Sequence, residues 1–366
     1  MIRWREILRE AWRDTACGTS RALLALGLFA VGVGALGWAQ AAGVVGVAKD
    51  AARWVEVGAA VRIIDFPNLV DGAQCEALTS LDGVVAAGAV RSGNERRLAA
   101  MPSRSFETFE VTPAMAEVLN LRTPEVAEGL GVWLASDLAE ALAAKPGRTM
   151  TVRALHVPAT VAGVFDFPAD DGRNPALAYS LIEPVAATGV FDACWITAWP
   201  ERLETDVLAR LVANPAPIDE SGQRPIPQVG QLNASLGISF DAHGRLARLP
   251  TSSLIAAAGL FGLVLGIGLI RLRRLELASA LHAGVPKSAL GIQTAAETLT
   301  WVIAASVLLI PVLWFASTND NPDSPWPAMF PATQTVAIAG IAVLLGTIGA
   351  TLATREKHLF RLFKNR

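Results

Sequence analysis

The side chains best placed for chemistry lie in one stretch, residues 271–297, RLRRLELASALHAGVPKSALGIQTAAE. Three arginines lie in its first four residues, and Glu297 ends it just inside a long apolar run. Ionisable residues within membrane segments are costly and tend to be functional. Because Glu297 lies near one end of its apolar run, its side chain can extend to the interface. We therefore expect Glu297 to act in coupling or packing and not in proton transfer.

Common catalytic signatures are missing from the sequence. It contains no GxxxxGK[ST], GxSxG, HExxH or CxxC, which argues against ATP hydrolysis by this chain and against the familiar hydrolase and zinc motifs. The four histidines, His156, His243, His282 and His358, are scattered, and no two have ligand spacing. We expect no catalytic residue, no metal site and no enzyme activity.

Composition points to a membrane. The chain has 366 residues, 17% of them charged, and a mean hydropathy of +0.41. These values indicate an integral membrane protein with a sizeable polar portion. Basic residues crowd at Arg3–Arg21, Arg271–Arg274 and Arg355–Arg366, each beside a long apolar run. Membrane topology explains these clusters more simply than nucleic-acid binding, so the lipid bilayer is an expected partner and nucleic acid is not.

Four apolar runs are long enough to cross a hydrocarbon core, which takes about 20 helical residues. We expect transmembrane helices at 22–48, 251–270, 289–316 and 333–354. The basic flanks place both termini in the cytoplasm and the protein in the cytoplasmic membrane. Gly262 and Gly266 form a GxxxG in the second run, a spacing that favours close helix packing.

The remaining segments follow from this topology. We expect an amphipathic interfacial helix at 1–21, an extracytoplasmic domain at 49–250, a cytoplasmic coupling segment at 271–288, a short extracellular loop at 317–332 and a basic cytoplasmic tail at 355–366. The fold class is thus an α+β membrane protein with four transmembrane helices and one large extracytoplasmic α+β domain between spans 1 and 2.

Alternating patterns divide the large domain into strands and helices. Strands are expected at 61–66, 83–90, 106–111, 149–156, 160–167, 177–182 and 194–198, and helices at 71–81, 113–119, 136–144 and 202–212. Asp71 is expected to cap the first helix. Residues 214–250 read as an extended return to the membrane.

The three cysteines divide between the two sides of the membrane. Cys17 falls on the cytoplasmic side and is expected to be a free thiol. Cys75 and Cys194 both fall in the external domain, an oxidising place where thiols seldom stay unpaired. We predict a disulfide between them.

The sequence Gly284-Val285-Pro286 breaks the coupling segment. Glycine weakens a helix and proline cannot continue one, so a compact elbow is expected between two helical pieces. A helix of this kind at the cytoplasmic face is a surface for a partner to push. The simpler alternative is a basic loop that only obeys the positive-inside rule.

The segment resembles the cytoplasmic coupling segment of the MacB/FtsX permease family. The matching positions are Arg273, Arg274, Glu276, Leu281, Ala283, Gly284 and Glu297, while Ser279 and His282 stand where the family has arginine or lysine. Residues 105–167 also resemble the periplasmic core domain of that family, through FEVTPAMAEVLNL, GVWLASDLAEAL, PGRTMTV and VAGVFDFP in this order.

This resemblance implies the permease subunit of an ABC transporter that works by mechanotransmission. It implies a homodimer or heterodimer with a related permease, and a separate ATPase that binds ATP and Mg²⁺, so that this chain needs no cofactor. Its contacts with the ATPase would come from Arg273, Arg274, Glu276, Leu281, His282, Gly284 and Glu297.

The resemblance further implies that peptide, lipid-linked or antibiotic-like substrates, or an accessory protein, bind on the outer side of the membrane.

Two alternative functions stay open. One is a cell-division-type regulator of a cell-wall hydrolase, and the other is a membrane receptor or scaffold without any ATPase.

Overall fold

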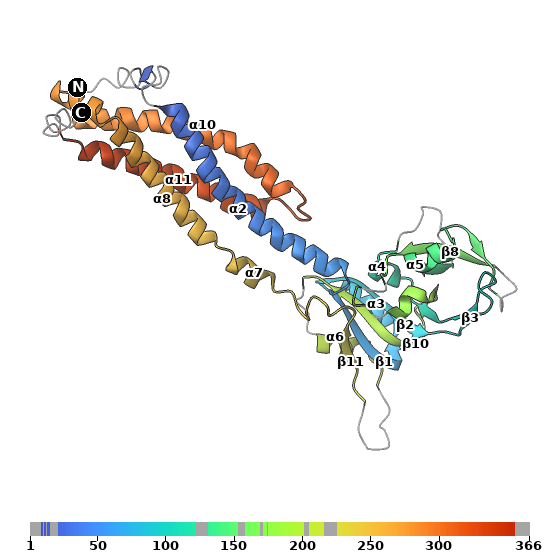
Figure 1. Cartoon of the computed structure of the whole chain (residues 1–366). Coiled ribbons are helices and arrows are strands. Elements are labelled where there is room, and N and C mark those ends of the chain that lie inside the picture. The colour runs from blue at the N-terminus through green and yellow to red at the C-terminus, as the bar shows by residue number, and fades with distance from the viewer. Residues whose placement is uncertain are drawn as a thin grey trace. The chain divides into compact units, whose positions relative to one another are not determined.

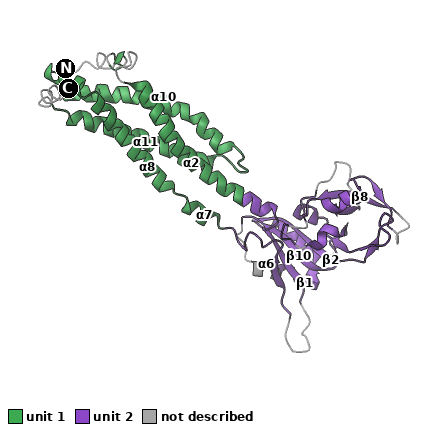
Figure 2. Ribbon diagram, viewed as in Figure 1, with its two compact units in different colours: residues 1–50, 241–366 green, residues 51–240 purple. Residues whose placement is uncertain are grey.

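The computed structural model describes residues 9, 11, 13–14, 21–121, 131–152, 158–168, 171–173, 175–200, 205–215 and 225–355. Most of the interfacial helix expected at 1–21, Cys17 and nearly all of the tail expected at 355–366 lie outside this range. The chain divides into two compact units, residues 1–50 with 241–366, and residues 51–240 (Figure 2).

The first unit is built from long apolar helices (Figure 1). These are α2 (Ala22–Glu56), whose last residues enter the second unit, α8 (Thr251–Leu272), α10 (Lys287–Thr318) and α11 (Trp326–Ala353), with the short α7 (Ala242–Arg248) ahead of α8. Four helices of the described residues, counting α7 and α8 as one, are long and apolar enough to cross a membrane. This agrees with the four expected spans, although α11 begins inside the range expected to be a loop.

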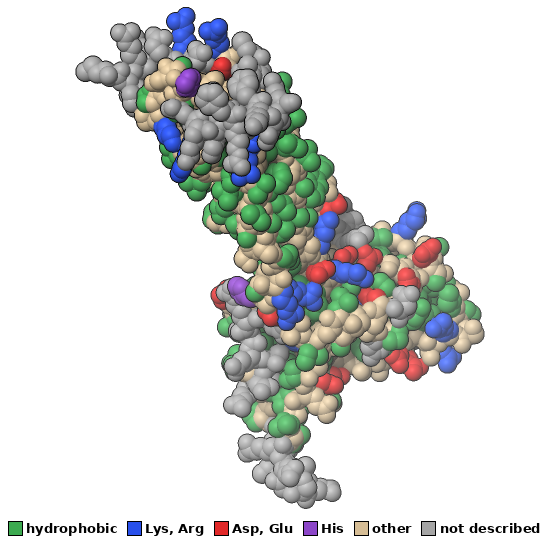
Figure 3. Space-filling view, turned by 60° about the vertical axis from the view of Figure 1, so that its left-hand side comes forward, with side chains coloured by type: hydrophobic (Ala, Val, Ile, Leu, Met, Phe, Trp, Pro, Cys, Tyr) green, Lys and Arg blue, Asp and Glu red, His purple; other side chains and the backbone are tan. Residues whose placement is uncertain are grey.

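The outward faces of this unit are apolar, as Figure 3 shows over the length of the helices. Ile303 and Val307 of α10 and Ile341 and Leu345 of α11 are each more than half exposed. A water-soluble bundle would place polar side chains at such positions. The exposed apolar faces are therefore suited to lipid.

Glycines bring α8 and α11 into backbone contact. A Cβ atom added at Gly262 would collide with the carbonyl oxygen of Ala339, and one at Gly266 with that of Val343. From the other helix, a Cβ at Gly346 would lie 2.5 Å from the oxygen of Leu263. The structure thus places both glycines of the predicted GxxxG in contact with the backbone of α11.

Hydroxyl pairs connect α10 to α11. The Oγ1 atoms of Thr294 and Thr351 lie 3.2 Å apart, and Thr298 donates to Thr347 at 3.4 Å. All four threonines are buried. In a hydrocarbon environment such pairs satisfy polar atoms that water cannot reach.

The second unit is a mixed β-sheet with short helices on it. Among the described residues, nine strands form this sheet in the order β11-β1-β10-β2-β5-β9-β6-β8-β7. β5 runs parallel to β9 and β6 parallel to β8, and the other neighbours are antiparallel.

The sheet strands and the helices that pack with them have these bounds: β1 Val61–Asp71, α3 Gly72–Ala77, η1 Leu78–Ser80, β2 Val84–Ser92, β5 Thr108–Val111, α4 Met115–Val118, β6 Val132–Ala135, α5 Ser136–Ala141, β7 Thr149–Met150, β8 Ala159–Phe165, η2 Pro175–Tyr179, β9 Leu181–Pro184, β10 Val190–Ala198, α6 Thr205–Val212 and β11 Gln228–Gln231. A separate two-stranded ribbon joins β3 (Arg96–Arg97) to β4 (Ser105–Phe106). The mixture of strands and helices confirms the α+β class.

The sequence expectations differ from the structure in three details. The strand expected at 177–182 is a 3-10 turn, η2, followed by β9 from Leu181. The extended return expected at 214–250 includes the edge strand β11, but it ends in the helix α7 of the first unit, which was not expected. The strand β6, inside the GVWLASDLAEAL motif, was not expected, because four residues that are buried on both faces show no alternation.

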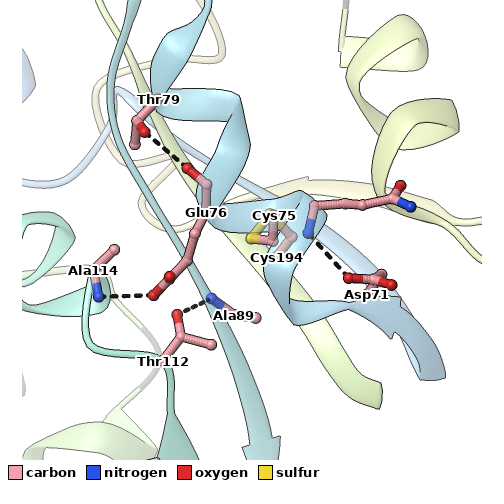
Figure 4. Close-up of a disulfide and its surroundings, with 9 residues drawn as sticks. Asp71, Cys75, Glu76, Thr79, Ala89, Thr112, Ala114 and Cys194 are labelled. Atoms are coloured by element: carbon pink, nitrogen blue, oxygen red, sulfur yellow. Dashed lines mark hydrogen bonds between the residues drawn. A yellow bond between two sulfur atoms is a disulfide. The ribbon is translucent and has the colours of Figure 1, made fainter. Parts of the chain in front are cut away.

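The predicted disulfide between Cys75 and Cys194 is confirmed (Figure 4). Cys75 lies on α3, and Cys194 lies within β10, the last but one of the described strands along the chain. Asp71 caps α3 as expected, because its Oδ1 accepts from the Gln74 backbone N–H at 3.0 Å. Farther along α3, Glu76 accepts a hydrogen bond from the N–H of Ala114, just before α4. The disulfide thus joins α3 to β10, and this hydrogen bond joins it to the start of α4.

Candidate functional site

A sharp change of direction separates α8 from α10. α8 ends at Leu272, Arg273 follows with φ −102° and ψ 9°, and α9 runs from Arg274 to His282. α10 then starts at Lys287, behind Pro286. The expected break at Gly284-Val285-Pro286 is present, and a further break at Arg273, which was not expected, makes α9 a nine-residue helix between two long ones.

The elbow after α9 depends on Gly284. Its φ is +89°, a region that side-chain-bearing residues avoid. The Gly284 N–H donates to the Leu281 carbonyl at 3.0 Å, and the Val285 N–H donates to that of Ala280 at 3.1 Å. This is the pattern in which glycine closes a helix C-terminus. The compact elbow expected at Gly284-Val285-Pro286 is present between α9 and α10.

Arg273 is the centre of a buried ionic cluster. Its side chain is 10% exposed, and its guanidinium forms an ion pair with Glu297 of α10, which is 3% exposed. Its Nε donates to Glu276 of α9 at 3.0 Å, and a terminal nitrogen lies 3.5 Å from Asp14. Gln293, one turn before Glu297, donates to Asp14 at 2.9 Å and faces Glu297 at 3.4 Å. We call these five residues the arginine cluster.

The carboxylates around Arg273 keep its guanidinium charged. Burial alone lowers the pKa of Arg273, but the carboxylates of Glu297 and Glu276 more than offset this, so its pKa is raised from the ordinary value. The arginine therefore stays charged. A buried charge is tolerated only when it is paired and hydrogen-bonded, and here one guanidinium joins α9, α10 and residue 14.

α9 has an inner face and an outer face. Leu277 and Leu281 are 5% and 6% exposed and pack with Ile270 and Leu290. Arg274, Ser279 and His282 are exposed, and the Glu276 side chain is 59% exposed. The outer face of α9, defined as Arg274, Glu276, Ser279 and His282, is thus polar and accessible in this chain.

One sequence expectation for this site was wrong. We expected Leu281 to contact the ATPase, but its side chain is buried within its own chain. Leucine on a short helix packs wherever apolar neighbours are available, and Ile270 and Leu290 provide them. A charge at this position would disrupt the elbow itself and would not test a partner contact.

Two residues of the cluster were not expected. Gln293 lies four residues before Glu297, a spacing that places both on one helix face and could have been noticed. Asp14 is 259 residues away from Arg273 in sequence, and nothing local indicates the contact. Glu297 and Arg273 were both singled out, but their pairing was not.

The role of Gly284 can be tested against a matched glycine. A Cβ added at Gly284 or at Gly291 of α10 meets nothing within 4 Å, so the two sites differ mainly in φ. We expect Gly284→Ala to destabilise the chain by about 1–2 kcal/mol, the cost of the left-handed conformation. Gly291→Ala should stabilise it by about 0.5–1 kcal/mol. Thermal unfolding of the purified variants would measure both, and equal effects would contradict the assignment of the elbow to φ.

Comparisons with known proteins give structural neighbours only. No family model matches the chain, and no curated protein matches it. Among solved structures it is similar to the periplasmic region of MacB from Actinobacillus actinomycetemcomitans, at 13% identity and a TM-score of 0.32, over 47% of this chain and 87% of that one.

Two further neighbours are of the same kind. The extracellular domain of the noncanonical ABC-type transporter YknZ from Gram-positive bacteria has 14% identity and a TM-score of 0.31, over 46% of this chain and 98% of that one. A domain of a putative permease protein from Porphyromonas gingivalis has 12% identity and a TM-score of 0.30, over 42% and 81%. Likeness at these scores carries no functional argument.

Proposed function

We propose that this chain is the permease subunit of an ABC transporter of the MacB/FtsX kind, in which a separate ATPase supplies the energy. ATP and Mg²⁺ would be bound by that ATPase. The sheet unit would lie outside the membrane, and both termini inside. The chain would act as a dimer and move peptide, lipid-linked or antibiotic-like substrates at the outer face.

The observation that carries this proposal is the construction of α9. A short helix with an accessible polar outer face is joined through Arg273 to Glu297 on α10. An ordinary basic loop has no need for a buried ion pair to a membrane helix, which costs desolvation energy. A segment that receives a push and passes it to α10 does need such a rigid connection.

The proposed mechanism follows from these contacts. Movement of the outer face of α9 would be transmitted at two points, by the arginine cluster to α10 and by the packing of Leu277 and Leu281 on Ile270 of α8. Packed interfaces respond to such displacement by changing between discrete arrangements and not by gradual deformation. The chain itself would supply no catalytic group.

The proposal is tested by purifying the full chain from native membranes and identifying what accompanies it. We expect an ABC-type ATPase, and we expect Arg274→Glu/Ser279→Glu on the outer face of α9 to reduce its recovery strongly. Arg97→Glu, an exposed arginine of β3 in the sheet unit, is the matched control and should keep the ATPase.

Each other outcome has a definite meaning. A chain recovered without any ATPase would overturn the proposal and favour a receptor or scaffold. An ATPase that the α9 variant retains fully would mean that the contact lies elsewhere. A cell-wall hydrolase recovered together with the ATPase would favour the regulator.

A further inference from the structure

A cavity of about 550 Å³ opens in the sheet unit, between the end of α5 and the edge strand β7. Its lining also includes residues 98–100, which follow β3. Cavities that hold small ligands in proteins usually measure about 300–1,000 Å³. This one therefore has the capacity for a small molecule.

The floor of the cavity is apolar. Leu98 and Val161 are 2% and 1% exposed and belong to one hydrophobic cluster, against which Leu142 and Met150 are packed. All four residues line the cavity. A hydrocarbon chain placed here would contact the half-buried Leu142 and Met150, with Leu98 and Val161 buried behind them.

The rim is cationic. Lys145 and Arg148 both line the cavity and are exposed, and its lining includes no acidic residue. Within the described part of the chain, neither forms an ion pair. Both would therefore be available to an anionic group at the mouth.

The turn that carries these two cations is held in place. The Gly147 N–H donates to the Val161 carbonyl and the Val161 N–H donates to that of Arg148, each at 2.8 Å. Gly147 has a φ of +81°, which a tight turn here requires. The turn is thus fixed to β8 on the floor of the cavity, and the positions of the cations relative to that floor are defined.

We propose that this cavity binds an anionic amphiphile, with its phosphate or carboxylate head between Lys145 and Arg148 and its hydrocarbon chain on Leu142 and Met150, which pack against the buried Leu98 and Val161. The proposal goes beyond the transport function and does not depend on it, because binding at this site needs no ATPase. A purely polar anion would leave the floor uncovered, and a neutral chain would leave both cations without a partner.

The test is calorimetric titration of the full chain, held in an amphipathic polymer, with hexyl phosphate. Inorganic phosphate and hexanol are separate arms. We expect hexyl phosphate to bind about tenfold or more tightly than either, because only it engages both rim and floor. Lys145→Gln/Arg148→Gln should lose about tenfold or more of this affinity.

Two further variants make the result specific. Arg53→Gln/Arg97→Gln removes the same charge from exposed positions outside the lining and should bind as the parent does. Ala144→Trp should fill the cavity and reduce the binding of hexyl phosphate but leave that of inorganic phosphate unchanged. Equal binding of hexyl phosphate and inorganic phosphate, or loss of binding in the control variant, would overturn the proposal.

Discussion

Arg273→Met is expected to reduce the free energy of unfolding by about 3–5 kcal/mol, because it leaves Glu297 buried without its cation. Glu276 can turn toward water and Asp14 keeps its bond from Gln293, so the loss comes chiefly from Glu297. Denaturation of the purified chain in mixed micelles would measure it. Arg274→Met, which removes the neighbouring exposed arginine, is the matched control and should change the free energy by less than about 0.5 kcal/mol.

A double variant separates the ion pair from the arginine itself. Arg273→Met/Glu297→Met removes both charges and should recover most of the stability that Arg273→Met loses, since an apolar replacement of a buried pair is often neutral. If the stability returns and ATPase-linked activity does not, the pair serves coupling. If Arg273→Met is as stable as Arg274→Met, the arginine cluster described above is wrong.

The disulfide should have an effect of similar size in the other unit. Cys75 and Cys194 are 119 residues apart, and in the chain-entropy model closure of such a loop stabilises the native state by about 4–5 kcal/mol. For a unit of about 190 residues, we expect Cys75→Ala/Cys194→Ala to lower its melting temperature by roughly 8–20 °C. Tryptophan fluorescence would follow this transition, because Trp195 is adjacent to Cys194 on β10.

The covalent state can be read directly by mass. Alkylation of the unfolded chain without reductant should modify Cys17 alone, and alkylation after reduction should modify all three cysteines. Cys17→Ser is the control and should leave the melting temperature unchanged. Modification of Cys75 or Cys194 without reductant would contradict the bond.

Much of the fold could be predicted from the sequence because its signals are local. Uncharged runs of more than 20 residues identify α2 and α11 by length alone, and Asp71 with Gln74 identifies the start of α3. The pairing of Cys75 with Cys194 followed from topology, because both were assigned to the same oxidising side. None of these inferences needed a contact between distant residues to be known in advance.

What could not be predicted depends on such contacts. The parallel pairing of β5 with β9 places Thr108 opposite Leu181, and the sequence of neither strand indicates which strand it pairs with. The inward direction of Leu281 depends on Ile270 and Leu290 on two other helices. In the same way, the sequence shows Arg273 only as a basic residue beside an apolar run. The sequence therefore located the site, but it did not predict the ion pair between Arg273 and Glu297.

The glycine contact between α8 and α11 has a consequence for synthesis. α8 is complete at Leu272, whereas α11 is complete only at Ala353, so at ribosomal rates about 4–16 s separate the two. During this interval Gly262 and Gly266 present bare backbone to lipid or to the insertion machinery, because the carbonyls that cover them belong to a helix not yet made. A larger residue at either glycine would then act on maturation as well as on the finished protein, and lower yields in the membrane would precede any loss of activity.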